Sequence, residues 1–199
     1  YRQCGTIWLA EDDDELYEAA RKARFYQQHG IKAQLLDQTQ LRQLEPHLAH
    51  DLCGGVRVPD DAIIYPPLAA KYFFDGALAR GLTRIVDRVI AVQEQQVLTA
   101  NQQRYQAQHI IVCAGNHSAE LLPQLTLKMK KGQLAITERN ETLLHHQAIE
   151  LGYIKNAHLS AGDSVAANLQ PRPTQQVLIG SSSQFDDHSD EINWPLLNA

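Results

Sequence analysis

The sequence predicts an α+β fold, in which a mixed or antiparallel sheet accompanies a smaller part of α/β character. Short stretches rich in β-branched and aromatic residues alternate with longer stretches of helical periodicity. Three closely spaced strands follow one of the helices, and the last of them runs into the uniformly apolar segment 110–114. A strand of that composition suits a sheet that helices cover on both faces.

Composition and charge argue against several classes of function. The 199 residues are 44% hydrophobic and 21% charged, as in ordinary globular proteins, and they carry a formal net charge of −5. This charge argues against nucleic acid or an anionic membrane surface as the main partner. No apolar run approaches the roughly 20 residues of a membrane helix, and the N-terminus lacks the features of a signal peptide.

The cysteines and histidines predict no metal site. Cys4, Cys53 and Cys113 are an odd, widely spaced set, which is typical of reduced thiols, and Cys113 is expected to be a small core residue. The nine histidines show no paired ligand spacing. The adjacent His145 and His146 cannot share a helix face, so both are expected to be exposed to solvent.

The first part of the chain predicts strands that alternate with helices. The acids at the start of the first helix lie at the positive end of its dipole, which explains their clustering without a metal. The expected elements are a strand at 5–10, a helix from Glu11–Glu15 to His29–Gly30, a strand at 33–36, and a helix between the capping box Asp37–Gln40 and Pro46. Gly54 and Gly55 then lead into the stretch VRVP.

A third helix and a three-stranded meander are expected next. The helix begins at Pro66 and ends at Gly81, and Phe73 and Phe74 lie on its predicted buried stripe together with Ala70, Ala77 and Leu78. Tyr72 and the two phenylalanines are interpreted as core residues rather than as a platform for a ligand. Short polar links join strands expected at 88–92, 97–100 and 105–115, which indicates an antiparallel arrangement.

The segment HIIVCAGNHSAELL, residues 109–122, predicts a strand-to-helix turn. Gly115 and Asn116 tolerate backbone angles that larger residues avoid, and Asn116 or Ser118 is expected to cap the helix Ala119–Leu122. A turn without bulky side chains is where a fold brings its backbone against a ligand. An ordinary connection with nothing bound is the alternative, because an isolated glycine turn is a weak signal.

Beyond Pro123 the composition becomes more polar. The lysines of KMKKGQLAIT suggest an anion patch, but a solvated strand end explains them better. The expected elements are a strand at 128–137, a loop with minor structure at 138–162, a hairpin of 163–173 with 175–183 across the turn Arg172–Pro173–Thr174, and a final helix capped by Ser189.

Several short motifs together resemble the D-amino-acid oxidase, glycine oxidase and sarcosine oxidase family of FAD-dependent oxidoreductases. They occur in family order: YRQCGTIWLA, LLDQTQLRQLEP, GGVRVPDDAIIYP, HIIVCAGNHS, KGQLAIT and QPRPTQQVLIGSSSQF. The family's G-x-G-x-x-G turn and its C-terminal segment with a carboxylate-binding arginine have no match here. The resemblance therefore implies the central part of a longer enzyme, and a short protein that has lost flavin binding is the competing hypothesis.

The resemblance also assigns domains. Residues 66–124 would be a portion of the FAD domain, whereas 1–65 and 125–199 would build most of a substrate domain. Without the pyrophosphate-binding turn, this chain alone is expected not to retain FAD.

Four residues are implied as FAD contacts. The backbone of Val89 would contact the adenine end of FAD. Ala114 and Gly115 match the small pair of residues that lets the chain approach the cofactor. His117 replaces a tryptophan of the family pattern A-G-x-W-S; it still packs and donates a hydrogen bond but covers less apolar surface.

Two polar residues are implied on the substrate side. Asn168, three residues before Pro171, replaces a tyrosine of glycine oxidase-like members, and Ser183 replaces a methionine of some members. Both would face the substrate, and both offer hydrogen bonds where the family offers an aromatic hydroxyl and a thioether.

The implied chemistry is oxidation of an amine or amino acid by hydride transfer to flavin, with oxygen or a quinone-type acceptor restoring the flavin. No general base is required; Asp60 and Asp61 are the nearest candidates, and a turn role fits them better. A hydroxy-acid dehydrogenase of the same superfamily and a flavin-free binding module are the alternatives. The expected location is the cytoplasm, or the periphery of the inner membrane if the acceptor is a quinone.

Overall fold

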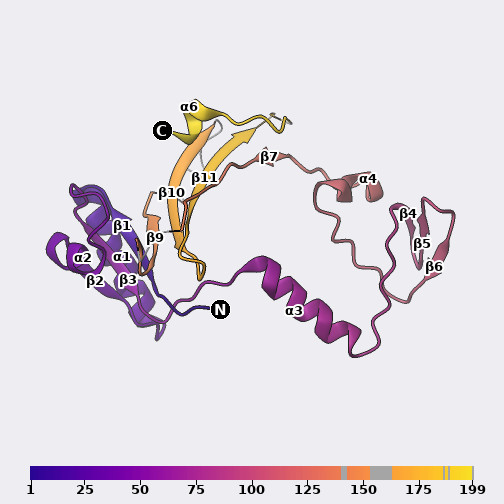
Figure 1. Ribbon diagram of the computed structural model, residues 1–199, viewed down its shortest axis with the longest axis horizontal. Helices are drawn as coiled ribbons and strands as arrows, with labels where there is room; N and C mark the ends of the chain where they lie inside the picture. The colour runs from indigo at the N-terminus through magenta and orange to yellow at the C-terminus, as the bar shows by residue number, and fades with distance from the viewer. Residues whose placement is uncertain (140–142, 153–162, 186, 188, 199) are drawn as a thin grey trace. The chain divides into compact units, whose positions relative to one another are not determined.

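The chain folds into two compact units. The computed structural model describes all residues except 140–142, 153–162, 186, 188 and 199. One unit, the sheet unit, comprises Tyr1–Pro67 and Lys130–Ala199, and the other, the meander unit, comprises Leu68–Met129 (Figure 1). Helices and sheets occur in both, so the predicted α+β class is confirmed. None of the helices in the described part of the chain has the length and hydropathy needed to cross a bilayer.

The sheet unit is built on one mixed sheet of eight strands. Its order is β2-β3-β1-β9-β10-β11-β7, and β8 also pairs with β11. Strands β1 and β9 are parallel, whereas the other pairs are antiparallel. The strands are β1 (Thr6–Ala10), β2 (Gln34–Asp37), β3 (Gly54–Val58), β7 (Lys130–Lys131), β8 (Ala135–Ile136), β9 (Gln147–Glu150), β10 (Ser164–Pro171) and β11 (Val177–Phe185).

Helix α1 (Asp13–Gln28) and helix α2 (Gln38–Leu44) cover opposite faces of this sheet. Side chains alternate along β1, so Ile7 and Trp8 point to different faces. Ile7 belongs to the cluster that contains Leu41 of α2, whereas Trp8 packs with Ala19 of α1. The two helices lie beside β1–β3 in Figure 1.

Both helix starts are capped by an aspartate, and the second cap is the capping box that the sequence predicts. Asp12 accepts a hydrogen bond from the Glu15 backbone N–H at 2.7 Å. The capping box of α2 is complete: Asp37 accepts from the Gln40 N–H at 2.8 Å, and the Gln40 side chain accepts from the Asp37 N–H at 3.0 Å. These bonds satisfy amide groups that a helix leaves free in its first turn.

The C-terminal segment differs from its prediction. Helix α6 (Trp194–Leu197) is capped by Asn193, not by Ser189. Ser189 instead contacts Asp187, which also pairs with Lys131 at 2.8 Å. The solvated strand end predicted for Lys131 is wrong: only 13% of its side chain is exposed, because three oxygen acceptors of this segment surround its ammonium group.

Strand β9 lies inside the region that the sequence predicts as a loop, of which 140–142 and 153–162 are outside the described residues. It forms because β1, from the far N-terminal part of the chain, and β10, the following strand, offer backbone partners on its two edges. The expected exposure of His146 is also wrong. His146 is buried and contacts the carboxylate of Glu45, whose side chain is fully buried.

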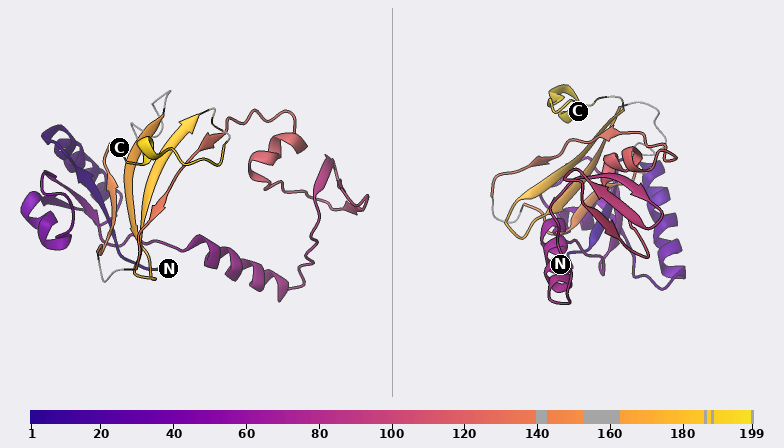
Figure 2. Two further views of the ribbon diagram at one scale, coloured as in Figure 1. Left: turned by 45° about the horizontal axis from the view of Figure 1, so that its top comes forward. Right: turned by 90° about the vertical axis from the view of Figure 1, so that its right-hand side faces the viewer.

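The meander unit carries the predicted three-stranded antiparallel sheet, which Figure 2 shows from two further sides. Its strands follow one another closely because the polar links between them are only a few residues long. The elements are α3 (Pro66–Leu78), which begins at the end of the sheet unit, β4 (Val89–Gln93), β5 (Gln96–Thr99), β6 (Arg104–Gln106), the 3-10 turn η1 (Gly115–His117) and α4 (Ser118–Leu121).

Burial in this unit departs from the prediction. The strand expected at 105–115 is wrong beyond Gln106, where β6 ends, because segment 110–114 belongs to no strand. Ile111 is 85% exposed, and Cys113 is exposed rather than in a core. Helix α3 has no buried residue, and Phe73 is 72% exposed. Segment 110–114 and helix α3 are exposed for the same reason. An apolar stripe is buried only where another layer packs on it, and the described chain supplies no such layer at these positions.

Candidate functional site

The turn that follows segment 110–114 has the open backbone that its sequence predicts. Gly115 adopts a positive φ of 57°, and a Cβ added there would meet nothing within 4 Å. Ala114 precedes the turn η1, and α4 follows it. The expected cap is absent, since neither Asn116 nor Ser118 caps α4 and His117 occupies the N-cap position without a side-chain bond. The turn therefore presents backbone and small side chains.

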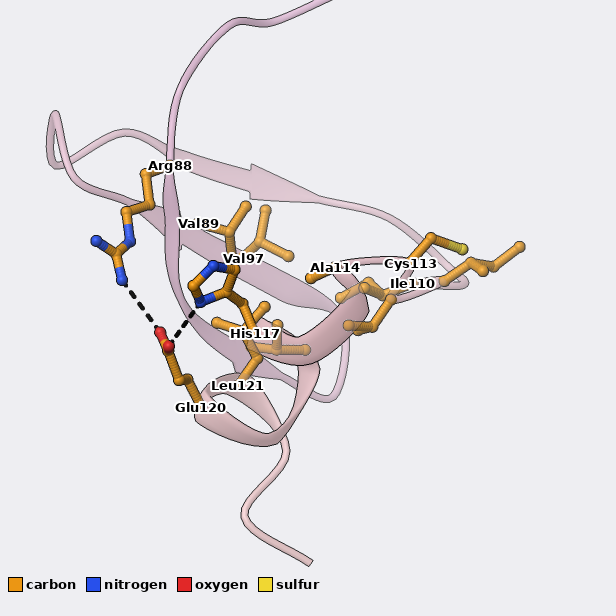
Figure 3. A pocket seen from close by; sticks show the side chains of 12 residues that line it. Arg88, Val89, Val97, Ile110, Cys113, Ala114, His117, Glu120 and Leu121 are labelled. Carbon is orange, nitrogen blue, oxygen red and sulfur yellow. Dashed lines mark hydrogen bonds and ion pairs between the residues drawn. The ribbon is translucent and has the colours of Figure 1, made fainter. Parts of the chain in front are cut away.

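The meander and this turn enclose a pocket of about 520 Å³ (Figure 3). Three of the predicted cofactor residues, Val89, Ala114 and His117, line it together; Gly115 adjoins Ala114 but is not among the lining residues. The walls are largely apolar, and the volume is within the range of small-molecule sites. The other lining residues are Arg88, Val92, Val97, Ile110, Ile111, Val112, Cys113, Glu120 and Leu121.

A charged group on the pocket wall centres on Glu120. Its carboxylate contacts Arg88 at 3.0 Å and His117 Nδ1 at 2.7 Å, as the dashed lines in Figure 3 mark. The hydrogen bond from His117, followed by the bond from Arg88, lowers the pKa of Glu120 below its ordinary value. A carboxylate only accepts, so Nδ1 carries the proton and Nε2 of a neutral His117 is an acceptor.

Sequence reasoning missed Arg88 and Glu120. The spacing His117-x-x-Glu120 was a usable signal, because residues three apart on a helix are neighbours. Arg88 carried no such signal, since its pairing with Glu120 depends on how α4 packs on β4.

The predicted substrate residues lie in the sheet unit, on the long hairpin of β10 and β11. Asn168 pairs with Gly180, and Ser183 pairs with Ser164, with a shift of register between Val165 and Asn168. Gly180 and Ser183 are three positions apart on β11, or about 10 Å at the rise of a strand. The register thus places the two predicted residues at separate points of one hairpin.

The two acids considered as bases have structural partners. Asp60 lies in the turn after β3 and pairs with Lys32 at 2.9 Å. Asp61 accepts from the Thr6 hydroxyl at 2.6 Å and from the Ala62 N–H at 2.9 Å. The bond between Asp61 and Thr6 links the turn after β3 to β1, and the pair of Asp60 with Lys32 links it to the segment before β2.

Comparison with known proteins identifies the family. Residues 1–199 match the family DAO, described as FAD dependent oxidoreductase. The chain belongs to this family. Its structure is similar to that of glycine oxidase from Geobacillus kaustophilus, with a TM-score of 0.78 and 20% identity over 99% of this chain. L-proline dehydrogenase from P. horikoshii is similar to the same degree, with a TM-score of 0.78 and 14% identity over 99% of the chain.

The chain spans about half of these DAO structures, namely 52% of the glycine oxidase and 54% of the L-proline dehydrogenase. A curated relative from Mus musculus, the mitochondrial pyruvate dehydrogenase phosphatase regulatory subunit, is 27% identical over 128 residues, which are 61% of this chain and 14% of that protein. At these identities the solved structures establish the fold that the chain shares with DAO proteins.

Proposed function

We propose that this chain is part of an FAD-dependent oxidoreductase that oxidises an amine or amino acid by hydride transfer to flavin. The observation that carries the proposal is the convergence of Val89, Ala114 and His117 on one pocket beside the open turn at Gly115. Membership of the DAO family supports it. Residues 66–124 would then belong to the FAD domain, and 1–65 with 125–199 to the substrate domain.

The residues of the pocket fit one end of FAD rather than its pyrophosphate. Apolar walls suit the face of a flat ring, and the backbone at Ala114–Gly115 leaves room for close approach. The charge of Arg88 is offset by Glu120, which also accepts a hydrogen bond from His117, so this rim is a poor cradle for a phosphate pair. The G-x-G-x-x-G turn that binds the pyrophosphate of FAD in this family has no match in residues 1–199. We therefore expect these residues alone to hold FAD weakly or not at all.

When bound, flavin supplies the electron-accepting chemistry. The chain's own contribution is to orient the substrate and keep water out. Asn168 and Ser183 would hold polar groups of the substrate by hydrogen bonds, and His117 would cover the cofactor. Oxygen or a quinone-type acceptor then takes the electrons, in the cytoplasm or at the inner membrane surface.

The first test uses the full-length gene product. Purified protein should be yellow, and a primary or secondary amino acid should bleach its flavin absorbance without oxygen. Ala114→Trp should fill the pocket and reduce FAD uptake at least about tenfold, because the added ring occupies the volume of a ligand. The matched control is Ala107→Trp, which adds the same side chain at an exposed position of the meander unit. Unchanged FAD uptake in the Ala114 variant would reject the pocket as a flavin site.

A hydroxy-acid dehydrogenase is a second candidate. A structure with 20% identity and a TM-score of 0.70 over 91% of this chain is that of L-alpha-glycerophosphate oxidase from Mycoplasma pneumoniae, and a glycerophosphate carries hydroxyl groups rather than an amine. The same bleaching experiment separates the candidates: amino acids reduce the flavin in one case and hydroxy acids in the other.

A flavin-free binding module is the third candidate, and the relative named as a phosphatase regulatory subunit favours it. A full-length product that is colourless and takes up no added FAD would support this function and reject both enzymes.

A further inference from the structure

A second, smaller cavity lies at the tip of the β10–β11 hairpin, beside the N-terminal segment (Figure 1). Its volume is about 120 Å³, which admits a small ion and is far below the roughly 300–1,000 Å³ of sites for larger ligands. Arg2 and Arg172 line this cavity, and both residues are half-buried. The cavity lies within the sheet unit and shares no residue with the pocket at Ala114.

The inner wall of this cavity belongs to the hydrophobic core. Leu144 and Val177 are 5% and 9% exposed, and both are members of the core cluster that contains Ile7. Pro171, the last residue of β10, is also buried. Water screens charges beside such a wall less than charges on an open surface, so an unpaired cation there is costly.

Backbone and side-chain contacts bring the two arginines to this place. Arg2 and Ile63 exchange two backbone hydrogen bonds, each of 2.9 Å, in an isolated antiparallel bridge. Arg172 approaches the same segment from the hairpin, because its Cζ lies over the ring of Tyr65, 5.5 Å from the ring centre and two residues beyond Ile63. A contact with the face of a ring uses none of the N–H donors of a guanidinium group.

No acid neutralises these two charges. Neither guanidinium group forms an ion pair or a side-chain hydrogen bond within the described part of the chain, and none of the described residues that line the cavity is acidic. Gln176, another residue of the wall, is already engaged, since it donates to the Thr137 carbonyl at 3.1 Å and accepts from the Thr174 hydroxyl at 2.9 Å. Two like charges at one small cavity repel each other unless an anion binds between them.

We propose that Arg2 and Arg172 form a binding site for a phosphate group, either the inorganic ion or the phosphate of a monoester. A guanidinium group presents a planar fork of N–H donors, which binds the oxygens of phosphate in pairs. The tetrahedral dianion offers oxygens to two such forks and neutralises both charges. A carboxylate, in contrast, offers one edge and one charge, so the pair of arginines favours phosphate.

The test is a phosphate titration of the full-length protein at about pH 8, where phosphate groups are dianions. NMR spectra of protein labelled with 15N-arginine follow the Nε–H signals, and Arg2→Gln and Arg172→Gln identify the two signals by removing them. Inorganic phosphate and methyl phosphate are the probes, and both signals should shift with a measurable Kd. Sodium acetate should bind at least about tenfold more weakly, and sodium chloride at equal ionic strength should leave the signals in place.

Removal of either arginine should weaken phosphate binding strongly. Arg2→Gln and Arg172→Gln each keep a polar side chain but lose the charge and the fork, and we expect the phosphate Kd to rise about 10- to 150-fold, the range for one hydrogen bond to a charged group. Arg172→Lys keeps the charge without the fork, so its Kd should lie between those of the parent protein and Arg172→Gln. The matched control is Arg84→Gln: Arg84 also lies over a ring, that of Phe74 at 5.6 Å, but it is exposed and lies in the meander unit, so the Kd should not change.

Each outcome decides the proposal. If neither phosphate probe shifts the two signals, or if the phosphate Kd is unchanged in both glutamine variants, the site is overturned. Acetate that binds as tightly as phosphate overturns the choice of ligand. Binding of inorganic phosphate alone supports a site for the free ion, and binding of methyl phosphate supports a site for a monoester.

Thermal melts show whether each variant folds. Should Arg172→Gln fail to fold because it loses the contact with Tyr65, Arg2→Gln decides alone, since that variant keeps the backbone bridge to Ile63. The titration involves no flavin, so its result is independent of the proposed oxidoreductase function.

Discussion

The two units differ in how they bury the apolar residues that their sequences place in regular patterns. In the sheet unit, Ile7, Leu36 and Val56 are at most 1% exposed. In the meander unit, residues 68–129, all of which the structure describes, only Thr99 is buried. Both units have well-formed helices and strands. Local pattern therefore predicts most of the helices and strands in both units, whereas burial depends on whether the fold supplies a second layer.

The largest expected effect tests the buried contact between distant segments of the sheet unit. The Glu45 carboxylate accepts from the backbone N–H groups of His145 and His146 and from His146 Nδ1, at 2.6 to 3.1 Å. Glu45→Ala leaves these donors without an acceptor, and we expect it to lower the free energy of unfolding by at least about 3 kcal/mol, because each buried donor left unpaired costs about 1–3 kcal/mol. Urea denaturation measures this loss. The exposed Glu94→Ala is the control, and equal midpoints for the two variants would contradict the role of Glu45.

The next prediction compares one helix from each unit directly. Leu41 of α2 is 2% exposed and Phe73 of α3 is 72% exposed. We expect Leu41→Ala to cost about 2–5 kcal/mol in unfolding free energy, because it leaves a cavity in a packed core. Phe73→Ala should stay within about 0.5 kcal/mol of the parent chain. If the two substitutions cost the same, the contrast between the units is wrong.

A smaller effect is expected at a helix start. Asp37→Ala removes the cap of α2 and should cost about 0.5–2 kcal/mol. Asn116→Ala is the matched control, because Asn116 makes no cap in the meander unit. Thermal melts of the two variants provide the measurement, and a loss at Asn116 as large as that at Asp37 would show that the cap is not the cause.

The smallest effect concerns pH at the C-terminal segment. The hydrogen bond from Lys131, with those from Ser189, places the pKa of Asp187 far below its ordinary value. A lowered pKa means that the carboxylate stabilises the docked segment above the unfolded pKa of about 3.9, and that this contribution is lost as the pH falls through the folded value.

Amide exchange of Asn193, whose N–H bonds to Gln133 at 3.1 Å, should report that undocking. Its protection should decline below about pH 4 in the parent chain. Asp187→Asn should lower the protection at neutral pH and abolish the pH response, and a persistent response in that variant would assign it to another group.

What the sequence predicted correctly is what neighbouring residues determine. The capping box of Asp37 and Gln40, the meander and the hairpin of β10 and β11 each depend on contacts within a few residues or across one turn. The small residues at Ala114–Gly115 identified a turn that does adjoin a pocket. The functional assignment of that pocket stays a prediction.

What the sequence did not predict depends on distant partners. Strand β9 has no strong pattern and forms beside β1, which lies about 140 residues earlier in the sequence. His146 can be buried because the carboxylate of Glu45, about one hundred positions earlier, accepts hydrogen bonds from its backbone N–H and its Nδ1. The apolar run 110–114 shows the opposite error: its composition indicates a buried strand, but composition says nothing of where the covering layer comes from.

The parallel pairing of β1 with β9 has a consequence for synthesis on the ribosome. Strand β1 ends at Ala10, yet the strand that completes its second edge begins at Gln147, after the whole meander unit has been made. Throughout that interval the nascent chain carries an unpaired edge in its central strand, which is open to wrong partners. Pairings that close so large a loop are slow to form, so the interval before β9 is made is the stage of synthesis at which β1 is most open to mispairing.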